Sequence, residues 1–443
     1  MKIAVLAVFA IPLWAQSPLS LKDAVRLAIE KHPSMEAAAA QVKAAETRLT
    51  QARSGYLPKL NYNESWQRGD NPVFVFSSLL TQHQFTEQNF AIGPLNRPDA
   101  MNNFQSQLIV DQTLWDAGIT RKQVRSAEKG RELAGEDQRR TRMELIAGVI
   151  RAYQGAVLSR EALMVAEEAV RSAEADLNRA EAVRAAGMAT DADVLAIRVH
   201  LAAMREQQIR RSYDLQTAGA ALNEALGLPL DTAHDLTTPL TPVAMKDAPL
   251  AQEEERARQA RPEARQVKIA SEVAQLQQDT ARSALLPQVS FRFLFEADRQ
   301  RFVTRGGANW LAAASLRWNL FNGFADRARI EEAGQAVIQA RAQQRQVDSA
   351  ISLQVRKAFH DWKAAQERIE VAQAAVAQAE ENLRIMKNRY ENGLNNVTDL
   401  LRSETALLEA RLRRLMAVHD QRLAAAALEL AAGALGADSD VLN

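Results

Sequence analysis

Cysteine is absent from this chain of 443 residues. Its absence excludes disulfide frameworks, thiolate metal sites, cysteine nucleophiles and lipid attachment through an N-terminal Cys. Aromatic residues make up only 5% of the chain, and the six His are scattered without the spacing of metal ligands. No set of nucleophile, base and acid stands out, and Arg305-Gly306-Gly307 lacks the strand and helix that a phosphate loop needs. We therefore predict no enzyme, no cofactor and no metal site.

The chain also lacks an excess of charge of one sign and, after the first residues, long apolar runs. The chain has 55 Lys and Arg against 54 Asp and Glu, so no overall field would draw it onto nucleic acid. After residue 15 no run of about 18 apolar residues occurs, and we expect no transmembrane helix. If the chain spans a membrane, only a closed β-barrel can do so.

The first 15 residues have the pattern of a secretory signal peptide. Lys2 supplies the positive start, residues 3–14 form the apolar stretch, and Ala15 is a small residue before the cleavage point. The apolar stretch is too short to span a bilayer as a helix. We predict a signal peptide over 1–15; a buried N-terminal strand is the alternative.

Proline is confined to a few parts of the chain. All 13 prolines lie outside two stretches, 99–228 and 288–443, which are rich in Ala, Glu, Gln, Arg and Leu. These residues favour helices, and Pro would break a helix interior, so both stretches can form very long helices. We expect helices over 19–55, 119–186, 191–226, 251–284, 324–391 and 397–432. The helix over 119–186 would be roughly 100 Å long and needs a coiled-coil partner.

The chain is internally duplicated. Two early pairs share an offset of 229 residues: His32-Pro33 with Arg261-Pro262, and Leu57-Pro58 with Leu286-Pro287. Five later pairs share an offset of 206 residues: Leu114-Trp115 with Leu320-Phe321, Tyr153 with Phe359, Gly187 with Gly393, Leu222 with Leu428 and Gly227 with Gly433. The first copy therefore carries an insertion of 23 residues between the Leu-Pro and the Leu-aromatic pairs. We assign a first repeat to 16–227, a linker to 228–250, a second repeat to 251–436 and a frayed tail to 437–443.

The long helices carry an apolar stripe with steps of three and four residues. It comprises Leu163, Ala166, Val170, Ala173, Leu177 and Ala180, and their equivalents Ile369, Ala372, Val376, Ala379, Leu383 and Met386. Such a seam is typical of a coiled coil. By itself it favours a soluble coiled coil, so a secreted or periplasmic scaffold without a channel is the alternative function.

Four segments alternate between apolar and polar residues with the period of two that is typical of strands. They cover about 59–68, 103–115, 288–296 and 310–320. Each is about ten residues long, the length of a tilted membrane strand. Four Trp lie on or beside these strands, where an aromatic belt at a membrane interface would place them: Trp66, Trp115, Trp310 and Trp318. Soluble hairpins with one buried face are the alternative.

Four strands cannot close a barrel, whose practical minimum is about eight. An oligomer must complete it: two copies would give eight strands and three would give twelve. The fold class that we predict is thus a mixed membrane protein. Four membrane strands of each copy contribute to a β-barrel, and its long coiled-coil helices continue the barrel as a tube.

The order of these motifs resembles the TolC-like outer-membrane factor family over nearly the whole chain. The resemblance rests on Leu19-Ser20-Leu21, His32-Pro33, Gly55-Tyr56-Leu57-Pro58, Leu114-Trp115-Asp116-Ala117-Gly118, its partner Leu320-Phe321-Asn322-Gly323, and the turns 187–195 and 393–401. It implies a homotrimer in the outer membrane, with a twelve-strand β-barrel and a twelve-helix tunnel in the periplasm. It also implies a passive export duct of a tripartite efflux pump or a type I secretion system. The implied partners are a periplasmic adaptor protein and an inner-membrane transporter of the RND or ABC type.

Two turns between long helices carry the residues that could act in such a duct. Gly187 and Gly393 interrupt helices, and Asp191, Asp193 and Asp399 begin the next ones. One interpretation is structural, since Gly allows the turn and an acid stabilises the first turn of a helix. The other is functional, since one Asp per chain becomes a ring of three in a trimer, and charge rings select ions.

The resemblance assigns further roles to residues near these turns. Asp399 matches the first of two acidic positions that constrict the channel in well-known members, whereas the second position holds Arg402. We therefore expect Asp399 to line a periplasmic gate, with Asp193 and Asp191 nearby. An Asp399–Arg402 pair that locks the tip is the alternative.

Two further assignments concern turns and loops. Adaptor docking is expected at the turns around Gly187-Met188 and Gly393-Leu394. The loop 69–102 contains the apolar string 73–80, which could extend a strand, cover the pore mouth or form a short helix.

Overall fold

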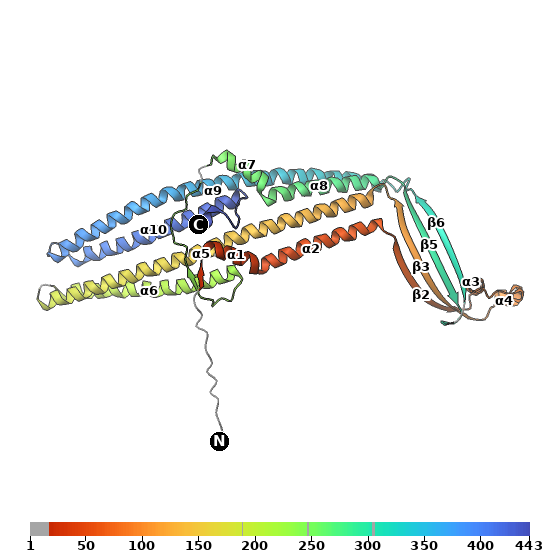
Figure 1. Ribbon diagram of the computed structural model, residues 1–443, viewed down its shortest axis with the longest axis horizontal. Helices are drawn as coiled ribbons and strands as arrows, with labels where there is room; N and C mark the ends of the chain where they lie inside the picture. The colour runs from red at the N-terminus through yellow and green to blue at the C-terminus, as the bar shows by residue number, and fades with distance from the viewer. Residues whose placement is uncertain (1–16, 188, 246–247, 304–305) are drawn as a thin grey trace, which may run out of the picture. The chain divides into compact units, whose positions relative to one another are not determined.

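The computed structural model describes residues 17–187, 189–245, 248–303 and 306–443 (Figure 1). The predicted signal peptide and Met188 lie outside the described residues. The chain divides into two compact units: a helical unit, of residues up to 41, 135–266 and 344–443, and a strand unit, of residues 42–134 and 267–343. Nowhere in the described ranges is a helix both long and apolar enough to cross a membrane.

Helices make up most of the chain. In order they are α1 (Leu21–Lys31), α2 (Pro33–Arg53), α3 (Pro72–Thr81), α4 (Ile92–Asn96), α5 (Ile119–Ala185), α6 (Asp191–Leu226), α7 (Leu250–Ala260), α8 (Pro262–Ser283), α9 (Ala325–Glu391) and α10 (Val397–Ala431), with 3-10 turns η1 (Ser54–Tyr56), η2 (Glu87–Phe90) and η3 (Asp440–Leu442). The strands are β1 (Ser17–Leu19), β2 (Lys59–Gly69), β3 (Met101–Trp115), β4 (His234–Leu236), β5 (Gln288–Arg299) and β6 (Gly307–Arg317). The ends of α5, α6, α9 and α10 differ from the predicted ends by at most one residue.

Two helices that the sequence predicted as continuous are broken. The predicted helix over 19–55 is interrupted between α1 and α2 at His32, whose φ of −70° and ψ of 131° are extended. The predicted helix over 251–284 is interrupted in the same way between α7 and α8 at Arg261, with φ −67° and ψ 132°. Each of these residues precedes a Pro, and steric clash with the Pro ring keeps such a residue out of the helical region. Both predictions of one continuous helix were therefore wrong.

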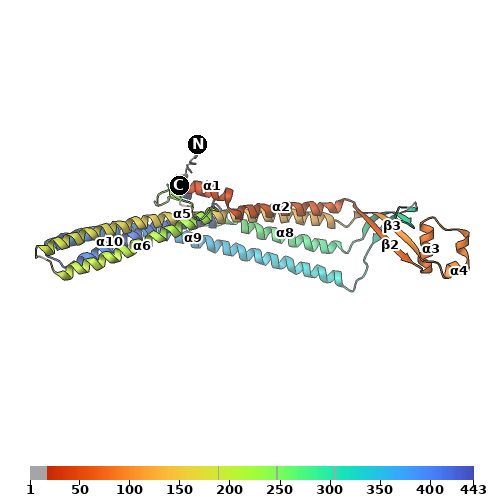
Figure 2. The ribbon, with the colours of Figure 1, turned by 90° about the horizontal axis from the view of Figure 1, so that it is seen from below.

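In the helical unit, α5 with α6 and α9 with α10 form two antiparallel hairpins (Figures 1 and 2). The predicted apolar stripe of α5 is buried at Val170 and Ala173, which pack against Leu201 and Met204 of α6 and Leu408 of α10. The stripe therefore joins the two hairpins, as the seam of a coiled coil does.

Two glycines bring the ends of α6 and α10 against the two helix breaks. Gly227 and Gly433 have φ of 70° and 72°, the left-handed conformation that favours Gly at a helix end. A Cβ added to Gly227 would lie 3.0 Å from the Cα of His32, and one added to Gly433 would lie 2.9 Å from the backbone N of Arg261. Each helix end therefore packs directly on the backbone of an extended residue, with no room for a side chain.

We expect Gly433→Ala to lower the free energy of unfolding by about 2 kcal/mol, because Ala is strained in the left-handed conformation and its Cβ would meet backbone atoms. Gly219→Ala is the matched control, since Gly219 lies within α6 and an added Cβ would meet nothing within 4 Å. There Ala should stabilise the helix by about 1 kcal/mol. Thermal unfolding followed by circular dichroism measures both effects, and equal melting temperatures of the two variants would contradict this packing.

The largest core of the helical unit surrounds Tyr153 in α5. This fully buried side chain donates its hydroxyl to the carbonyl oxygen of Leu19 at 2.7 Å and accepts from the backbone N of Thr238 at 3.1 Å. Gln421 of α10, 1% exposed, binds the linker at a second point, Val243. It donates from Nε2 to the carbonyl oxygen of Val243 at 2.7 Å and accepts from the backbone N of Val243 at 3.0 Å. The linker is thus anchored to both α5 and α10.

The C-terminal tail is packed, contrary to the prediction that residues 437–443 are frayed. Val441 and Leu442 are each 2% exposed and belong to the same core. Arg422 of α10 donates to the carbonyl oxygen of Asn443 at 2.7 Å. Burial of the two apolar side chains near the chain end holds the tail in place.

The strand unit is built on an antiparallel sheet with the order β2-β3-β5-β6 (Figure 1). The pairing register gives it a mainly apolar face, which carries Leu60, Tyr62, Trp66, Phe104, Leu108, Val110, Phe291, Phe293, Phe295, Trp310 and Leu316. Polar residues on this face include Glu64, Ser106, Gln112 and Arg299, and Arg299 forms an ion pair with Glu64. The opposite, polar face carries Asn61, Asn63, Ser65, Gln67, Asn103, Gln105, Gln107, Asp111, Ser290, Arg292, Glu296, Asp298, Asn309 and Ser315 among a few apolar residues. Within the described ranges, β2 and β6 pair on one side only, so the sheet has two open edges.

The strand β6 begins and ends earlier than its predicted range of 310–320. Gln288, the first residue of β5, pairs with Arg317, the last residue of β6. The alternation of apolar residues continues to Trp318 and Leu320, but β5 offers these residues no partner. The end of the pairing, which alternation does not reveal, therefore sets the end of the strand.

Candidate functional site at the tips of the helical hairpins

Asp193 and Asp191 stabilise the start of α6. The backbone N of Asp193 donates to Oγ1 of Thr190 at 3.2 Å, and the backbone N of Thr190 donates to the Asp193 carboxylate at 3.1 Å. This reciprocal arrangement is a capping box. The carboxylate of Asp191 lies 3.2 Å from Arg184, in the last turn of α5. Because both carboxylates have partners within their own hairpin, these contacts favour the structural interpretation for both residues.

Asp399 is placed differently from the acids of the other hairpin. Its backbone N donates to Oδ1 of Asn396 at 2.9 Å, so Asn396 caps α10 and the Asp399 carboxylate is not needed for capping. That half-buried carboxylate has no hydrogen bond or ion pair with any described residue. Arg402 is exposed and forms no ion pair with Asp399 in the part of the chain that the structure describes, so the predicted alternative of an Asp399–Arg402 lock is not formed.

Both predicted docking turns are exposed. Gly187 and Gly393 have φ of 75° and 69°, and a Cβ added to either would meet nothing within 4 Å. Leu394, which follows Gly393, is 67% exposed. Met188 lies outside the described residues. The turn at Gly393 thus presents an uncovered apolar side chain.

Immediately behind the turns, the two hairpins are in apolar contact. Ala180 of α5, Val194 and Ile197 of α6 and Val397 of α10 are buried in one cluster. Tyr390 of α9 packs against this cluster, and burial, together with the nearby carboxylates of Asp193 and Asp176, raises the pKa of its hydroxyl. The tips of the hairpins therefore hold each other together.

A group of polar residues links all four long helices beside this apolar contact. This group, here named the polar cluster, consists of Ser172, Asp176, His200, Lys387 and Glu404. Lys387 Nζ of α9 lies 3.0 Å from Asp176 Oδ1 of α5, and His200 Nε2 of α6 lies 3.2 Å from Glu404 Oε2 of α10. Ser172 donates its hydroxyl to Glu404 Oε1 at 3.3 Å. The Asp176 side chain is 5% exposed and that of Glu404 is 9% exposed, so these contacts are shielded from water.

The two acids of the polar cluster affect each other's ionisation. Burial and a hydrogen bond with Glu404 raise the pKa of Asp176 to about 6. Burial also opposes the ionised form of Glu404, but hydrogen bonds from His200 and Asp176 outweigh it and lower the pKa of Glu404. Below about pH 6, Asp176 therefore holds a proton while Glu404 beside it remains ionised. Across the described ranges, no group of three or more His, Asp and Glu residues is arranged to hold a metal ion.

The sequence analysis missed the polar cluster, although it examined the helices that form it. Asp176 directly precedes Leu177 of the apolar stripe, so an acid beside a seam was the available signal. His200, Lys387 and Glu404 carry no such signal, because a single sequence does not show which residues of four helices lie at the same level.

The four Trp of the predicted aromatic belt belong to the strand unit. Trp66 and Trp310 lie on the apolar face in β2 and β6. Trp115 is the last residue of β3, and Trp318 follows β6. All four are between 47% and 71% exposed, so nothing in the described chain covers them.

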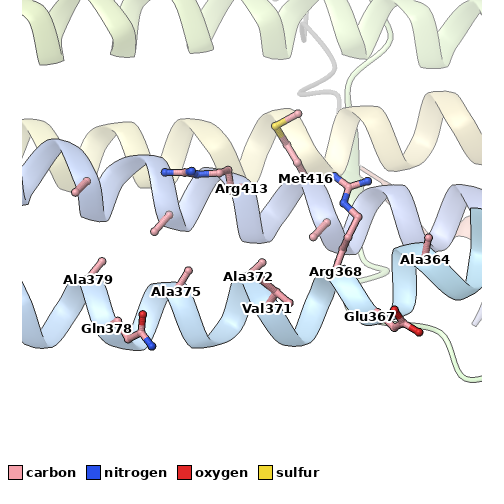
Figure 3. Close-up of a pocket in the computed structure, with 13 residues that line it drawn as sticks. Ala364, Glu367, Arg368, Val371, Ala372, Ala375, Gln378, Ala379, Arg413 and Met416 are labelled. Carbon is pink, nitrogen blue, oxygen red and sulfur yellow. The ribbon is translucent and has the colours of Figure 1, made fainter.

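A groove of about 820 Å³ runs between α9 and α10 (Figure 3). Ala372, Ala375 and Ala379 lie along the side of α9 that borders it, and small side chains also line it from α10. Val371 and Met416 at the groove are 72% and 53% exposed. This helix face is thus rich in small and apolar side chains and uncovered, with Glu367, Arg368, Gln378 and Arg413 also lining the groove.

Comparisons with known proteins identify what the chain is similar to. The sequence profile of the family described as Outer membrane efflux protein matches residues 24–228 and 255–434. Protein CyaE of Bordetella pertussis (strain Tohama I) is 29% identical over 422 residues, which cover 94% of this chain and 85% of that protein.

Solved structures share the fold. A membrane protein from Pseudomonas aeruginosa has a TM-score of 0.81 and 19% identity, over 96% of this chain and 93% of that chain. The Campylobacter jejuni CmeC outer membrane channel has a TM-score of 0.79 and 17% identity, over 100% of this chain and 95% of that chain. At these identities the likeness shows the fold alone: strands and long helical hairpins arranged as in these membrane proteins.

Proposed function

Because the chain belongs to the outer membrane efflux protein family, we propose that three copies of it form the passive export duct of a tripartite efflux pump or type I secretion system. The family is one of outer-membrane channels and not of enzymes. In the proposed trimer, three four-strand sheets close into a twelve-strand barrel in the outer membrane. The long hairpins continue it as a twelve-helix tunnel through the periplasm.

The sheet supplies the observation that carries this proposal. It has an apolar face with Phe, Leu and Trp side chains, a polar face, and two open edges at β2 and β6. Open edges bind further strands, and in a membrane only a closed barrel satisfies every backbone group. Pairing β2 of one copy with β6 of the next removes both edges. The apolar face then meets lipid, the exposed Trp meet its interfaces, and the polar face lines water.

The groove between α9 and α10 supports the same assembly. A trimer needs each pair of hairpins to pack on those of the next copy. The row of Ala in this groove lets a helix approach closely, and exposed Val371 and Met416 would be covered by it. A coiled-coil scaffold, the alternative function, could also use this groove, but it leaves the apolar face of the sheet unexplained.

The tips of the hairpins are the proposed gate. In a trimer, three Asp399 carboxylates form a ring at the narrow end, and no described residue of the chain pairs with the carboxylate. Arg402 places a positive ring one helical turn away. Asp193 and Asp191 lie in the neighbouring hairpin as capping residues.

We expect Asp399→Ala to weaken block of the reconstituted channel by divalent cations, because it removes the ring of unpaired charge. Planar-bilayer recordings with added cations measure this. Asp191→Ala is the control, since Arg184 already neutralises that carboxylate and its removal should change block little. A channel whose block is the same with and without the Asp399 carboxylate would rule out its place at the constriction.

The energy for export comes from another protein of the pump. The exposed turns at Gly187-Met188 and Gly393-Leu394 are the proposed docking points of a periplasmic adaptor, which connects to an energised inner-membrane transporter of the RND or ABC type. Docking separates the hairpins, and the substrate passes through water without any chemical step. Insertion of the purified protein into planar bilayers tests the function: discrete channels are expected, and a protein that forms none in any orientation would contradict it.

A further inference from the structure

The segment between β2 and β3, which includes the insertion of the first repeat, forms a folded element. This element, here named the mouth insertion, covers residues 70–100 and contains α3, η2 and α4. The apolar string at 73–80 lies within α3, which Asn71 caps by accepting from two backbone N–H groups. Phe85 packs edge to face on Phe76 and on Phe90, with ring centroids 4.8 and 5.1 Å apart. The insertion therefore has a small core of its own and is not an open loop.

Buried hydrogen bonds fix the mouth insertion to the sheet. Gln82, 2% exposed, donates from Nε2 to Oδ1 of Asn103 at 2.9 Å, and Asn103 donates to Oδ1 of Asp298 at 2.6 Å. Asn309 of β6 donates to the carbonyl oxygen of Thr81 at 3.1 Å. The insertion leaves the sheet from β2 and returns to β3, yet its contacts extend to β5 and β6. It thus crosses the ends of three strands.

All of these strand residues lie on one face of the sheet. Asn103 alternates with Gln105 and Gln107 on β3, Asp298 pairs with Gly307, and Glu296 pairs with Asn309, all on the polar face. Gly307 is buried on this face, and a Cβ added to it would overlap the carbonyl oxygen of Thr81. The absence of a side chain at Gly307 therefore lets the end of α3 lie directly on the polar face.

We propose that the mouth insertion is a fixed constriction inside the outer exit of the duct. This inference rests on the proposed function, in which the polar face lines the pore. Three insertions, one from each copy, project over the pore-facing side of the strand ends and narrow the exit. The size of what leaves is then limited at the exit as well as at the gate formed by the hairpin tips.

Polymer exclusion from oriented single channels tests this proposal. Neutral polyethylene glycols are added on the barrel side only, and the largest polymer that still lowers the conductance is recorded. Deletion of residues 72–99, which leaves a short loop like that between β5 and β6, should admit larger polymers from this side. Polymers added on the hairpin side should be admitted as before. An unchanged size limit on the barrel side would overturn the constriction.

Point variants keep the test valid if the deletion variant does not fold. Gln82→Ala removes the buried bonds to the sheet and should raise the size limit on the barrel side, whereas Ser77→Ala, at an exposed position of the same helix, should leave it unchanged. Equal limits for the two variants would contradict the proposal.

A separate experiment determines on which face of the sheet the mouth insertion lies. The chain has no Cys, so Thr81→Cys gives a single site for a fluorophore. Iodide in water should quench the fluorophore and brominated lipid should not; the reverse result would place the insertion on the lipid side and overturn the proposal. A protein that forms neither trimers nor channels would instead contradict the proposed function itself.

Discussion

Replacement of Leu394 by Glu is expected to abolish export while the trimer remains intact. Leu394 is 67% exposed at the tip of the α9–α10 hairpin, and its backbone N donates to the carbonyl oxygen of Arg389 at 2.8 Å, a bond that the substitution leaves in place. In the proposed docking, an adaptor covers this turn, and an unpaired charge there must lose its water. The cost is on the order of 4 kcal/mol, or about a thousandfold in affinity.

Two readouts separate docking from folding. Export by cells that carry the variant reports docking, and the mass of the purified variant in detergent reports the trimer. Leu230→Glu is the matched control, because Leu230 is 56% exposed in the linker, away from the tips, and that variant should still export. Normal export by Leu394→Glu would mean that the adaptor docks elsewhere.

Acid is expected to hold the hairpin tips closed, and Asp176→Asn is expected to abolish this dependence. With the hairpins in contact, the pKa of Asp176 is about 6; once water reaches the side chain, it returns to its ordinary value of 3.8. Between these values the closed form holds the proton and the open form has lost it. Lowering the pH through this window therefore stabilises the closed form, by up to about tenfold per pH unit, and above pH 6 this stabilisation is lost.

The charged and titratable groups around Asp176 come from the other three long helices. They are Lys387 of α9, Glu404 of α10 and, beside Glu404, His200 of α6. Lowering the pH from 7 to 5 should therefore reduce the open probability of the reconstituted channel. Tyr390 contacts the apolar cluster nearby, and its raised pKa keeps its hydroxyl neutral over this range.

Two substitutions isolate the contribution of Asp176. Asn at position 176 resembles protonated Asp, because its amide can donate to Glu404, so Asp176→Asn should stay closed at every pH. Lys387→Met removes the cation beside Asp176 and should open the channel at pH 7, with acid restoring closure. Asp214→Asn, at an exposed acid of α6, should behave as the unchanged protein. An unchanged pH profile in Asp176→Asn would remove the polar cluster from the gate.

The second repeat already contains the neutral version of this contact. Asn382 stands at the position equivalent to Asp176, at the offset of 206 residues, and donates to Ser403 at 3.3 Å. The chain thus has one neutral and one titratable polar contact at equivalent levels of its two hairpins. We therefore expect a dependence on pH from the contact at Asp176 and none from the contact at Asn382.

The elements that sequence patterns predicted well are those whose limits are set locally. The ends of the long helices were predicted to within one residue, since Pro is absent from them and the turns between them contain Gly and capping residues. The breaks at His32 and Arg261 also have a local cause, because the Pro after each residue keeps it extended. The prediction of continuous helices overlooked this effect of Pro. The ends of β6 and the packed tail depend on partners distant in sequence, so no local pattern revealed them.

The residues of the candidate site also differ in whether local sequence could predict their roles. The tip glycines and the first acids of α6 and α10 follow from turn and capping chemistry, which a sequence displays. That Asp193 and Asp191 have partners and the Asp399 carboxylate has none depends on side-chain geometry. The polar cluster could be predicted only if the alignment of the four long helices were known. The docking of Gln82 on the polar face could be predicted only if the pairing register of the strands were known.

Light-scattering mass of the purified protein, with and without detergent, tests the account most directly. In the proposed assembly, three copies pair the open edges of β2 and β6 to close one barrel, and detergent covers its apolar face. The account predicts a species of three chains that needs detergent to stay in solution and that fractionates with outer membranes. A monomer or dimer that is soluble without detergent would contradict it, because the four strands would then not be membrane strands.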